Sequence, residues 1–237
     1  MSSFSTSKGT TFPRYLCFFI GMSCVAFGVA ITANASLGTS PISTIAYVAH
    51  RIAGLKELQP AWAWTLGATS FVLNVVFFIA QCLMERGGFF RRQIWQLPAT
   101  FVFGAEIDLF RALVGDFTPY WAKLAATFFG AFVVALGILW ELAGDVLYLP
   151  GDGMVNSIAK ALKTPFGITK TCFDVSLTAI SVVAPLAIAR EIVGVREGTL
   201  IGAVMVGQFA RLMRPLVPKF RALVKITTAR ALEPDSR

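Results

Sequence analysis

The sequence predicts an all-α protein, a polytopic transmembrane helical bundle with an internal duplication, and three observations lead to this prediction. Of its 237 residues, 56% are hydrophobic and only 14% are charged, whereas soluble domains carry about 25% charged residues. Residues 61–84 contain no charge and are numerous enough to cross a bilayer. Four hydrophobic segments are followed by four similar ones, which is typical of transporters built from repeats.

The hydrophobic segments are expected in two sets of four. The first set is 12–33, 41–53, 61–84 and 94–113, and the second is 119–142, 153–162, 171–189 and 198–217. We therefore divide the chain into a first membrane repeat at 1–118, a second at 119–217 and a basic cytoplasmic tail at 218–237.

Glycines in the first segment of each set fall at matching positions. Gly21 and Gly28 are spaced seven residues apart, and so are Gly130 and Gly137. This spacing places each pair on one helix face, where small residues allow two helices to approach closely. We expect the two first segments to pack through these glycines.

The second segment of each set is too short to span a membrane as a helix. The uncharged run 15–49 would be about 52 Å long as a single helix, well beyond a bilayer of about 30 Å, so it must break, and Gly38 to Pro41 is the expected place. If each short segment crosses, the chain has eight membrane segments and parallel repeats. If each is re-entrant, it has six membrane segments and inverted repeats. The distribution of Lys and Arg fits both arrangements, and both place the two termini in the cytoplasm.

A glycine- and proline-containing turn opens each short segment, at 34–41 and at 147–153. The N-terminus of a helix carries about half a positive charge and binds anions or polar groups. Paired, broken segments at matching positions of two halves point to a substrate site near the middle of the membrane. The candidate substrate-binding residues are Asn34, Gly38, Thr39, Ser40, Pro41, Gly151, Asp152, Gly153 and Asn156. The alternative is that these are ordinary interfacial loops capped by small polar residues.

Acidic residues in apolar segments need a partner or a function, because charges are costly inside a membrane. The candidates for coupling to an ion or a proton are Asp145, Asp152 and Asp174. Asp108 and Arg111 are three residues apart and can form an ion pair on one helix face. Arg211 holds the position in the second half that Asp108 holds in the first, so an ion pair between the two halves is possible as well. Glu141 and Arg211 lie near segment ends, so we expect both at the depth of the lipid headgroups.

The sequence contains none of the common enzyme motifs, such as a P-loop, H-E-x-x-H or G-x-S-x-G. The single histidine, His50, is expected at the membrane interface, and it has no neighbouring residues with metal-ligand spacing. We therefore predict a protein that is not an enzyme, with no cofactor and no metal site.

The net charge of +8 reflects membrane topology more than nucleic-acid binding. Seven of the 21 Lys and Arg residues lie between positions 211 and 237, as expected of a cytoplasmic flank next to a last membrane helix. The expected partners are the lipid bilayer and, at the basic tail, anionic lipid headgroups. No nucleic-acid partner is expected.

Three short motifs resemble a known family. Leu37-Gly38-Thr-Ser-Pro41, the echo Pro150-Gly-Asp-Gly153, and Gly104 followed by Ile107-Asp108-Leu109-Phe110 are similar to the bacterial YczE/YyaS/YitT group of integral membrane proteins, over about residues 14–217. Some members of that group are classed with small-molecule exporters, so the resemblance implies a membrane protein with a transport role. It implies no particular catalytic residues.

The function expected from the sequence is that of a secondary transporter or exporter of a small polar or amphipathic molecule, in the bacterial cytoplasmic (inner) membrane. A membrane scaffold or regulatory protein that transports nothing is one alternative, and a permease subunit of a larger transporter is another. The substrate is unknown, and a homo-oligomer is compatible with the sequence.

Overall fold

The computed structural model describes residues 11–85, 93–144, 146–164, 166–189 and 196–223, and these residues fold into helices without any strand among them. The first half contains α1 (Thr11–Asn34), α2 (Pro41–Leu55), the 3-10 helix η2 (Ala61–Trp64), α3 (Leu66–Glu85) and α5 (Gln96–Val114). The second half contains α6 (Tyr120–Gly144), α7 (Pro150–Leu162), α8 (Phe166–Ala189), α9 (Glu197–Met213), the 3-10 helix η3 (Arg214–Leu216) and α10 (Val217–Leu223).

Four helices are long and apolar enough to cross a membrane. They are Phe12–Asn34, Leu66–Glu85, Tyr120–Gly144 and Ile168–Ala187, with mean hydropathies from 1.3 to 2.2. Large hydrophobic side chains such as Phe19, Val76 and Phe129 are exposed on these helices. Because water would not cover such surfaces favourably, they are suited to contact lipid, and the helices have the length and composition of membrane spans.

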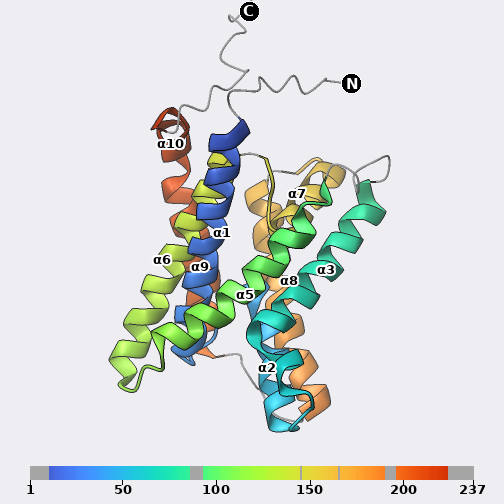
Figure 1. Cartoon of the computed structure of the whole chain (residues 1–237), viewed down its shortest axis with the longest axis vertical. Helices are drawn as coiled ribbons and strands as arrows, with labels where there is room; N and C mark the ends of the chain where they lie inside the picture. Colours follow the sequence, from blue (N-terminus) through green and yellow to red (C-terminus); the bar gives the residue numbers. More distant parts are fainter. Residues whose placement is uncertain (1–10, 86–92, 145, 165, 190–195, 224–237) are drawn as a thin grey trace, which may run out of the picture.

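The central contact joins α1 to α6 through the four predicted glycines. A Cβ added to Gly21 would lie 2.7 Å from the carbonyl oxygen of Gly137, and one added to Gly28 would lie 2.7 Å from that of Gly130. The prediction of close packing is therefore confirmed. Because Gly21 faces Gly137 and Gly28 faces Gly130, the two helices run antiparallel, as Figure 1 also shows.

The two short helices lie toward opposite ends of the molecule and begin near its middle (Figure 1). α2 packs against α8, and α7 packs against α3. Their first turns meet, since a Cβ on Gly151 would lie 2.9 Å from the side chain of Ile42. Neither helix crosses the molecule, with 15 residues in α2 and 13 in α7.

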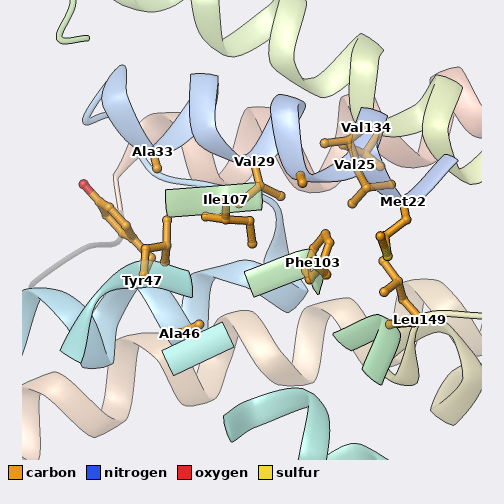
Figure 2. Close-up of a cluster of buried hydrophobic side chains, with 14 of the residues drawn as sticks. Met22, Val25, Val29, Ala33, Ala46, Tyr47, Phe103, Ile107, Val134 and Leu149 are labelled. Atoms are coloured by element: carbon orange, nitrogen blue, oxygen red, sulfur yellow. The ribbon is translucent and has the colours of Figure 1, made fainter. Parts of the chain in front are cut away.

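The main hydrophobic cluster lies between α1, α2, α5 and α6 (Figure 2). Met22, Val25 and Val29 of α1 face Phe103 and Ile107 of α5 in this cluster. Leu149, which immediately precedes α7, also belongs to it. The cluster therefore fixes the start of α7 relative to the central helices.

Three predicted boundaries are wrong. α7 starts at Pro150 and not at Gly153, because proline fits the first position of a helix and leaves no N–H unbonded there. The segment predicted at 171–189 starts at Phe166. The segment predicted at 61–84 is interrupted between the 3-10 helix and Leu66, so that α3 is a separate helix.

Candidate functional site

A small cavity lies where the first turns of α2 and α7 meet. Its volume is about 50 Å³, which is enough for about three to five water molecules at roughly 10–15 Å³ each. The polar residues lining it are Ser40, Ser43, Ser70, Asn74, Asp152, Lys170 and Asp174, and the apolar ones include Val25, Leu73, Phe103, Val134, Ile138 and Val206. The cavity is thus lined by both polar and apolar residues, and each kind comes from both halves of the chain.

The first turn of α2 offers backbone amides to this cavity. Ser40 is the N-cap residue in an extended conformation, and its side chain does not cap the helix. Its hydroxyl lies 3.4 Å from that of Ser43 instead. Since the first amides of a helix have no carbonyl one turn earlier, the N–H groups of Ile42 and Ser43 remain available for a polar ligand.

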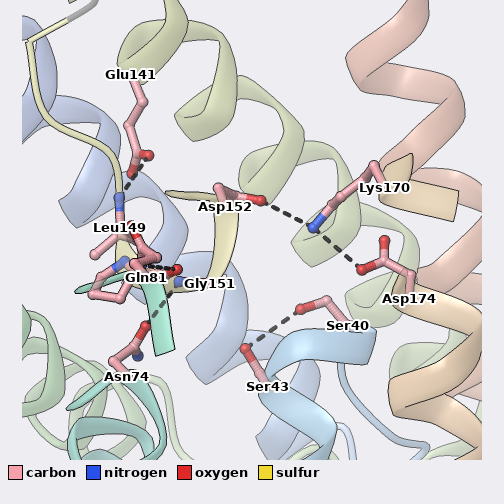
Figure 3. A network of polar contacts seen from close by, with 11 residues as sticks. Ser40, Ser43, Asn74, Gln81, Glu141, Leu149, Gly151, Asp152, Lys170 and Asp174 are labelled. Carbon is pink, nitrogen blue, oxygen red and sulfur yellow. Dashed lines mark hydrogen bonds and ion pairs between the residues drawn. The ribbon is translucent and has the colours of Figure 1, made fainter. Parts of the chain in front are cut away.

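The first turn of α7, in contrast, is bonded to the protein (Figure 3). The Gly151 N–H donates to Oδ1 of Asn74 at 3.3 Å, and the Leu149 N–H donates to Oε2 of Glu141 at 3.5 Å. Nε2 of Gln81 donates to the carbonyl oxygen of Pro150 at 2.8 Å. These contacts dock the start of α7 against α3 and α6, so the two short helices differ in what they can offer to a ligand.

A lysine between two aspartates forms the charged wall of the cavity (Figure 3). The Nζ of Lys170 lies 2.9 Å from Oδ1 of Asp152 and 3.2 Å from Oδ1 of Asp174. The three side chains are only 14–18% exposed. Two carboxylates and one ammonium leave a net charge of minus one, which favours a cation or an amino group beside them.

One hydroxyl in the cavity lacks a protein partner. Ser70 of α3 is 4% exposed and lines the cavity, and its Oγ makes no hydrogen bond in the described part of the chain. Buried hydroxyls are normally bonded, so an unpartnered one facing a cavity points to a ligand or a water.

The structure brings Ser40, Pro41, Gly151 and Asp152 of the predicted substrate-binding set together at the cavity, along with Asp174 of the predicted coupling set. Asp152 lies in the first turn of α7 and is not its N-cap, which is Leu149. Asp145 lies outside the described residues.

The other predicted substrate-binding residues lie away from the cavity lining. The amide of Asn34 donates to the carbonyl oxygens of Arg111 and Gly115, and Gly38, with a φ of 111°, packs against Thr199 of α9. The Thr39 hydroxyl, just before the start of α2, bonds to that of Thr44. On α7, Gly153 packs against Gln81, and Asn156 is half-buried.

The residues predicted to form ion pairs have other neighbours. Asp108 accepts a hydrogen bond from the Gly67 N–H at 2.8 Å. Nε of Arg111 donates to Oδ1 of Asn34 at 3.0 Å. Arg211 is exposed on α9.

Glu141, predicted at the depth of the lipid headgroups, is covered by the protein near the end of α6. Its side chain is 2% exposed, because α1 and the start of α7 cover the last turns of α6. One of its oxygens, Oε1, has no hydrogen-bond partner in the described structure.

His50, in the second half of α2, connects this helix to η2 and to α5. Its Nδ1 lies 2.7 Å from the Trp64 carbonyl oxygen and therefore carries the proton, so that Nε2 accepts from Arg111 at 3.3 Å. Burial lowers the pKa of His50, which lies outside the four candidate spans, from its ordinary value of 6.5. Burial therefore favours the neutral form of this histidine.

Sequence reasoning missed Lys170, Ser70 and Asn74 as members of the site. Lys170 follows the second short segment in the sequence, where a basic residue is typical of a segment end, but its side chain lines the cavity. Ser70 and Asn74 are four residues apart on α3, with Gln81 two turns further, so they mark one polar face on an apolar span. That spacing was visible in the sequence.

No cluster of three or more His, Cys, Asp or Glu side chains suited to a metal ion occurs among the described residues. The profile of a protein family described as "Family of unknown function (DUF6198)" matches residues 12–215. No curated protein and no solved structure matches the chain.

Proposed function

Because the chain belongs to DUF6198, a family of unknown function, we propose its function from the geometry of the site: it is a secondary transporter or exporter of a small polar or amphipathic molecule. The observation that carries this proposal is the cavity between the first turns of α2 and α7, lined by the buried Ser70 hydroxyl, which has no hydrogen-bond partner among the described residues. Broken helices that meet in the middle of a membrane protein are a common way to build a transport site.

The arrangement of helices supports an internal duplication. Gly21, Gly28 and Pro41 of the first half correspond to Gly130, Gly137 and Pro150 of the second, with the same sequence separation of 109 in each case. The packing is reciprocal as well, because α5 packs on α1 as α9 packs on α6, and α2 packs on α8 as α7 packs on α3.

The antiparallel contact of α1 with α6 favours inverted repeats with six spans over parallel repeats with eight. In this arrangement α1, α3, α5, α6, α8 and α9 cross the bilayer, and α2 and α7 enter from opposite sides to the middle. The start of α1 and the helix α10 lie at the same end of the molecule (Figure 1). We place this end in the cytoplasm of a bacterium, since the basic residues Lys219 and Arg221 lie there.

The cavity is suited to a molecule with both an acceptor group and a cationic group. The acceptor would take hydrogen bonds from the first amides of α2 and from Ser70, and the cationic group would lie beside Asp152 and Asp174. The apolar lining residues would contact a hydrocarbon part. Since the cavity holds only a few water molecules, a larger substrate would require the halves to move apart, which is the movement that alternating access needs.

Thiol accessibility in intact cells and in inverted vesicles tests this function without a known substrate. In a chain freed of its four cysteines, we expect Ser43→Cys in the cavity to react with small thiol reagents from both sides and with bulky impermeant reagents from neither. Asp116→Cys, in an exposed loop, is the control for labelling from one side, and Ser181→Cys, buried on α8, is the control for a sealed position. Free reaction of Ser43→Cys with bulky reagents would show that this position lies on an open surface, which would favour a scaffold protein. No reaction from either side would show that the cavity is part of the sealed core.

The same experiment decides the topology. Arg51→Cys and Lys163→Cys, near the ends of the two short helices, label from opposite sides in the six-span arrangement. Labelling from the same side would make the repeats parallel.

A further inference from the structure

Glu141 occupies an unusual place near the end of α6. Its carboxyl group is enclosed by α1 and by the residue before α7, with 2% of the side chain exposed. Gly21 of α1 makes room for it, because a Cβ there would lie 2.9 Å from Cγ of Glu141. The fold thus leaves a pocket on α1 for an acidic side chain inside a candidate span.

The polar surroundings of this carboxyl group are incomplete. Oε2 accepts a long hydrogen bond of 3.5 Å from the Leu149 N–H, and Oε1 has no partner in the described part of the chain. The corresponding residue of the first half, 109 positions earlier, is Thr32. Its hydroxyl donates to the Val29 carbonyl oxygen within its own helix. Only the second half therefore carries a titratable group at this position.

No cation neutralises Glu141 by contact among the described residues. The charged groups that act on it are Asp152 of α7 and Lys170 of α8, and the ammonium of Lys170 is already shared between two aspartates. Arg221 of α10 donates to the carbonyl oxygens of Leu142 and Ala143. On α1, the backbone of Arg14 packs against Gly144, and no ion pair joins Arg14 to Glu141 among the described residues.

We propose that Glu141 is a proton-binding site, and that its hydrogen bond to Leu149 links binding of the proton to the position of α7. A carboxylate without a counter-charge is costly in this environment, so the group is stable when the proton is bound to Oε1. A metal ion would need several more oxygen ligands, and the one group that contacts Oε2 is an N–H donor. Loss of the proton creates a charge that needs water, a cation or a shorter, charge-assisted bond from the Leu149 N–H, and each of these changes the position of the start of α7 relative to α6.

This proposal assigns the coupling proton of the transporter, so its second part rests on the proposed function. Asp152, Asp174 and Lys170 already neutralise one another in part and line the cavity. They are placed to contact the transported molecule. Glu141 lies behind the first turn of α7, where it can respond to movement of that helix without contacting the substrate.

Infrared spectroscopy of the purified protein in liposomes tests proton binding directly. We expect a carboxylic-acid C=O band that persists at neutral pH and is lost in Glu141→Gln. Glu197→Gln, in which an exposed carboxylate at the start of α9 is replaced, retains the band. A band of equal intensity in wild type and Glu141→Gln would overturn the proposal. Should Glu141→Gln fail to fold, Glu141→Thr introduces the residue of the first half and is judged by the same band.

The link to α7 is tested with Ser43→Cys in the cysteine-free chain. Its labelling rate, normalised to Asp116→Cys to correct for thiol ionisation, is expected to change with pH when Glu141 is present and to become independent of pH in Glu141→Gln. Equal pH dependence with and without Glu141 would refute the coupling role. If Ser43→Cys is inaccessible in every variant while the infrared band is lost in Glu141→Gln, the transport function fails and proton binding stands.

Discussion

Replacement of Gly28 by alanine tests the contact between the two halves. A Cβ at this position would lie 2.7 Å from the backbone oxygen of Gly130, 2.7 Å from Cγ2 of Val134 and 2.9 Å from its backbone N. Two of these three atoms belong to the backbone of α6, so a change of side-chain rotamer cannot relieve the clash. Overpacking of this kind costs about 1–3 kcal/mol.

Gly207 on α9 provides a matched control for this substitution. It is also a helical glycine, and a Cβ there meets no atom within 4 Å. Both substitutions gain about 0.5–1 kcal/mol because alanine loses less conformational freedom in a helix than glycine does. This gain cancels in the comparison, so the free energy of unfolding of Gly28→Ala should be lower than that of Gly207→Ala by the steric cost of about 1–3 kcal/mol.

Tryptophan fluorescence during thermal unfolding in detergent micelles measures the difference. For a chain of this size, each kcal/mol corresponds to about 2–4 °C in Tm. Gly207→Ala is expected at or above the wild-type Tm, and Gly28→Ala clearly below it. Equal Tm values for the two variants would show that the backbones of α1 and α6 are not in contact, and with them the proposed pairing of the halves would fail.

Three further substitutions test the site with the same unfolding assay. Lys170→Met leaves two uncompensated aspartates in the cavity wall and should cost about 3–5 kcal/mol. Ser70→Ala removes a hydroxyl without a protein partner and should leave stability unchanged or raise it, whereas Asn74→Ala leaves the amide of α7 unbonded and should cost about 1–3 kcal/mol. Burial lowers the pKa of His50, so its imidazole binds a proton more readily in the unfolded chain than in the folded one. The free energy of unfolding should therefore fall as the pH drops below 6.5, and it should fall less steeply in His50→Gln.

Each of these expectations has an outcome that contradicts it. If Lys170→Met is no less stable than wild type, the three charges are not in contact. Equal destabilisation by Ser70→Ala and Asn74→Ala would show that the Ser70 hydroxyl does have a hydrogen-bond partner in the protein. The same pH dependence of Tm with and without His50 would show that its proton equilibrium is not altered by folding.

Much of the helical framework follows from local features of the sequence. The start of α2 is predicted at Pro41, because the preceding glycine and small polar residues cannot continue an apolar helix. The start of α7 was placed three residues too late, since Gly151, Asp152 and Gly153 resemble a turn, although the proline before them begins the helix. α8 begins earlier than its apolar run because the charge of Lys170 is neutralised by contacts within the fold.

The candidate site is harder to predict from the sequence, because its contacts join residues that are far apart in the chain. Asn34 follows the same small-polar pattern as Ser40, yet its partner is Arg111, 77 residues away. The burial of Glu141 depends on Gly21 and on the path of the chain into α7, which hydropathy along α6 does not reveal. Position near a segment end predicts depth in the membrane and carries no information about what covers the residue.

The unequal bonding of the two short helices has an energetic consequence for the proposed transporter. With identical halves, the inward-open and outward-open conformations of an inverted repeat are related by a two-fold rotation about an axis in the membrane plane and have equal free energies. Here Asn74 and Gln81 hold α7 by hydrogen bonds, while the first turn of α2 has no side-chain cap. Each such bond is worth about 0.5–1.5 kcal/mol, and it must break in one conformation only. The empty protein would therefore rest predominantly on one side of its cycle, with α7 docked.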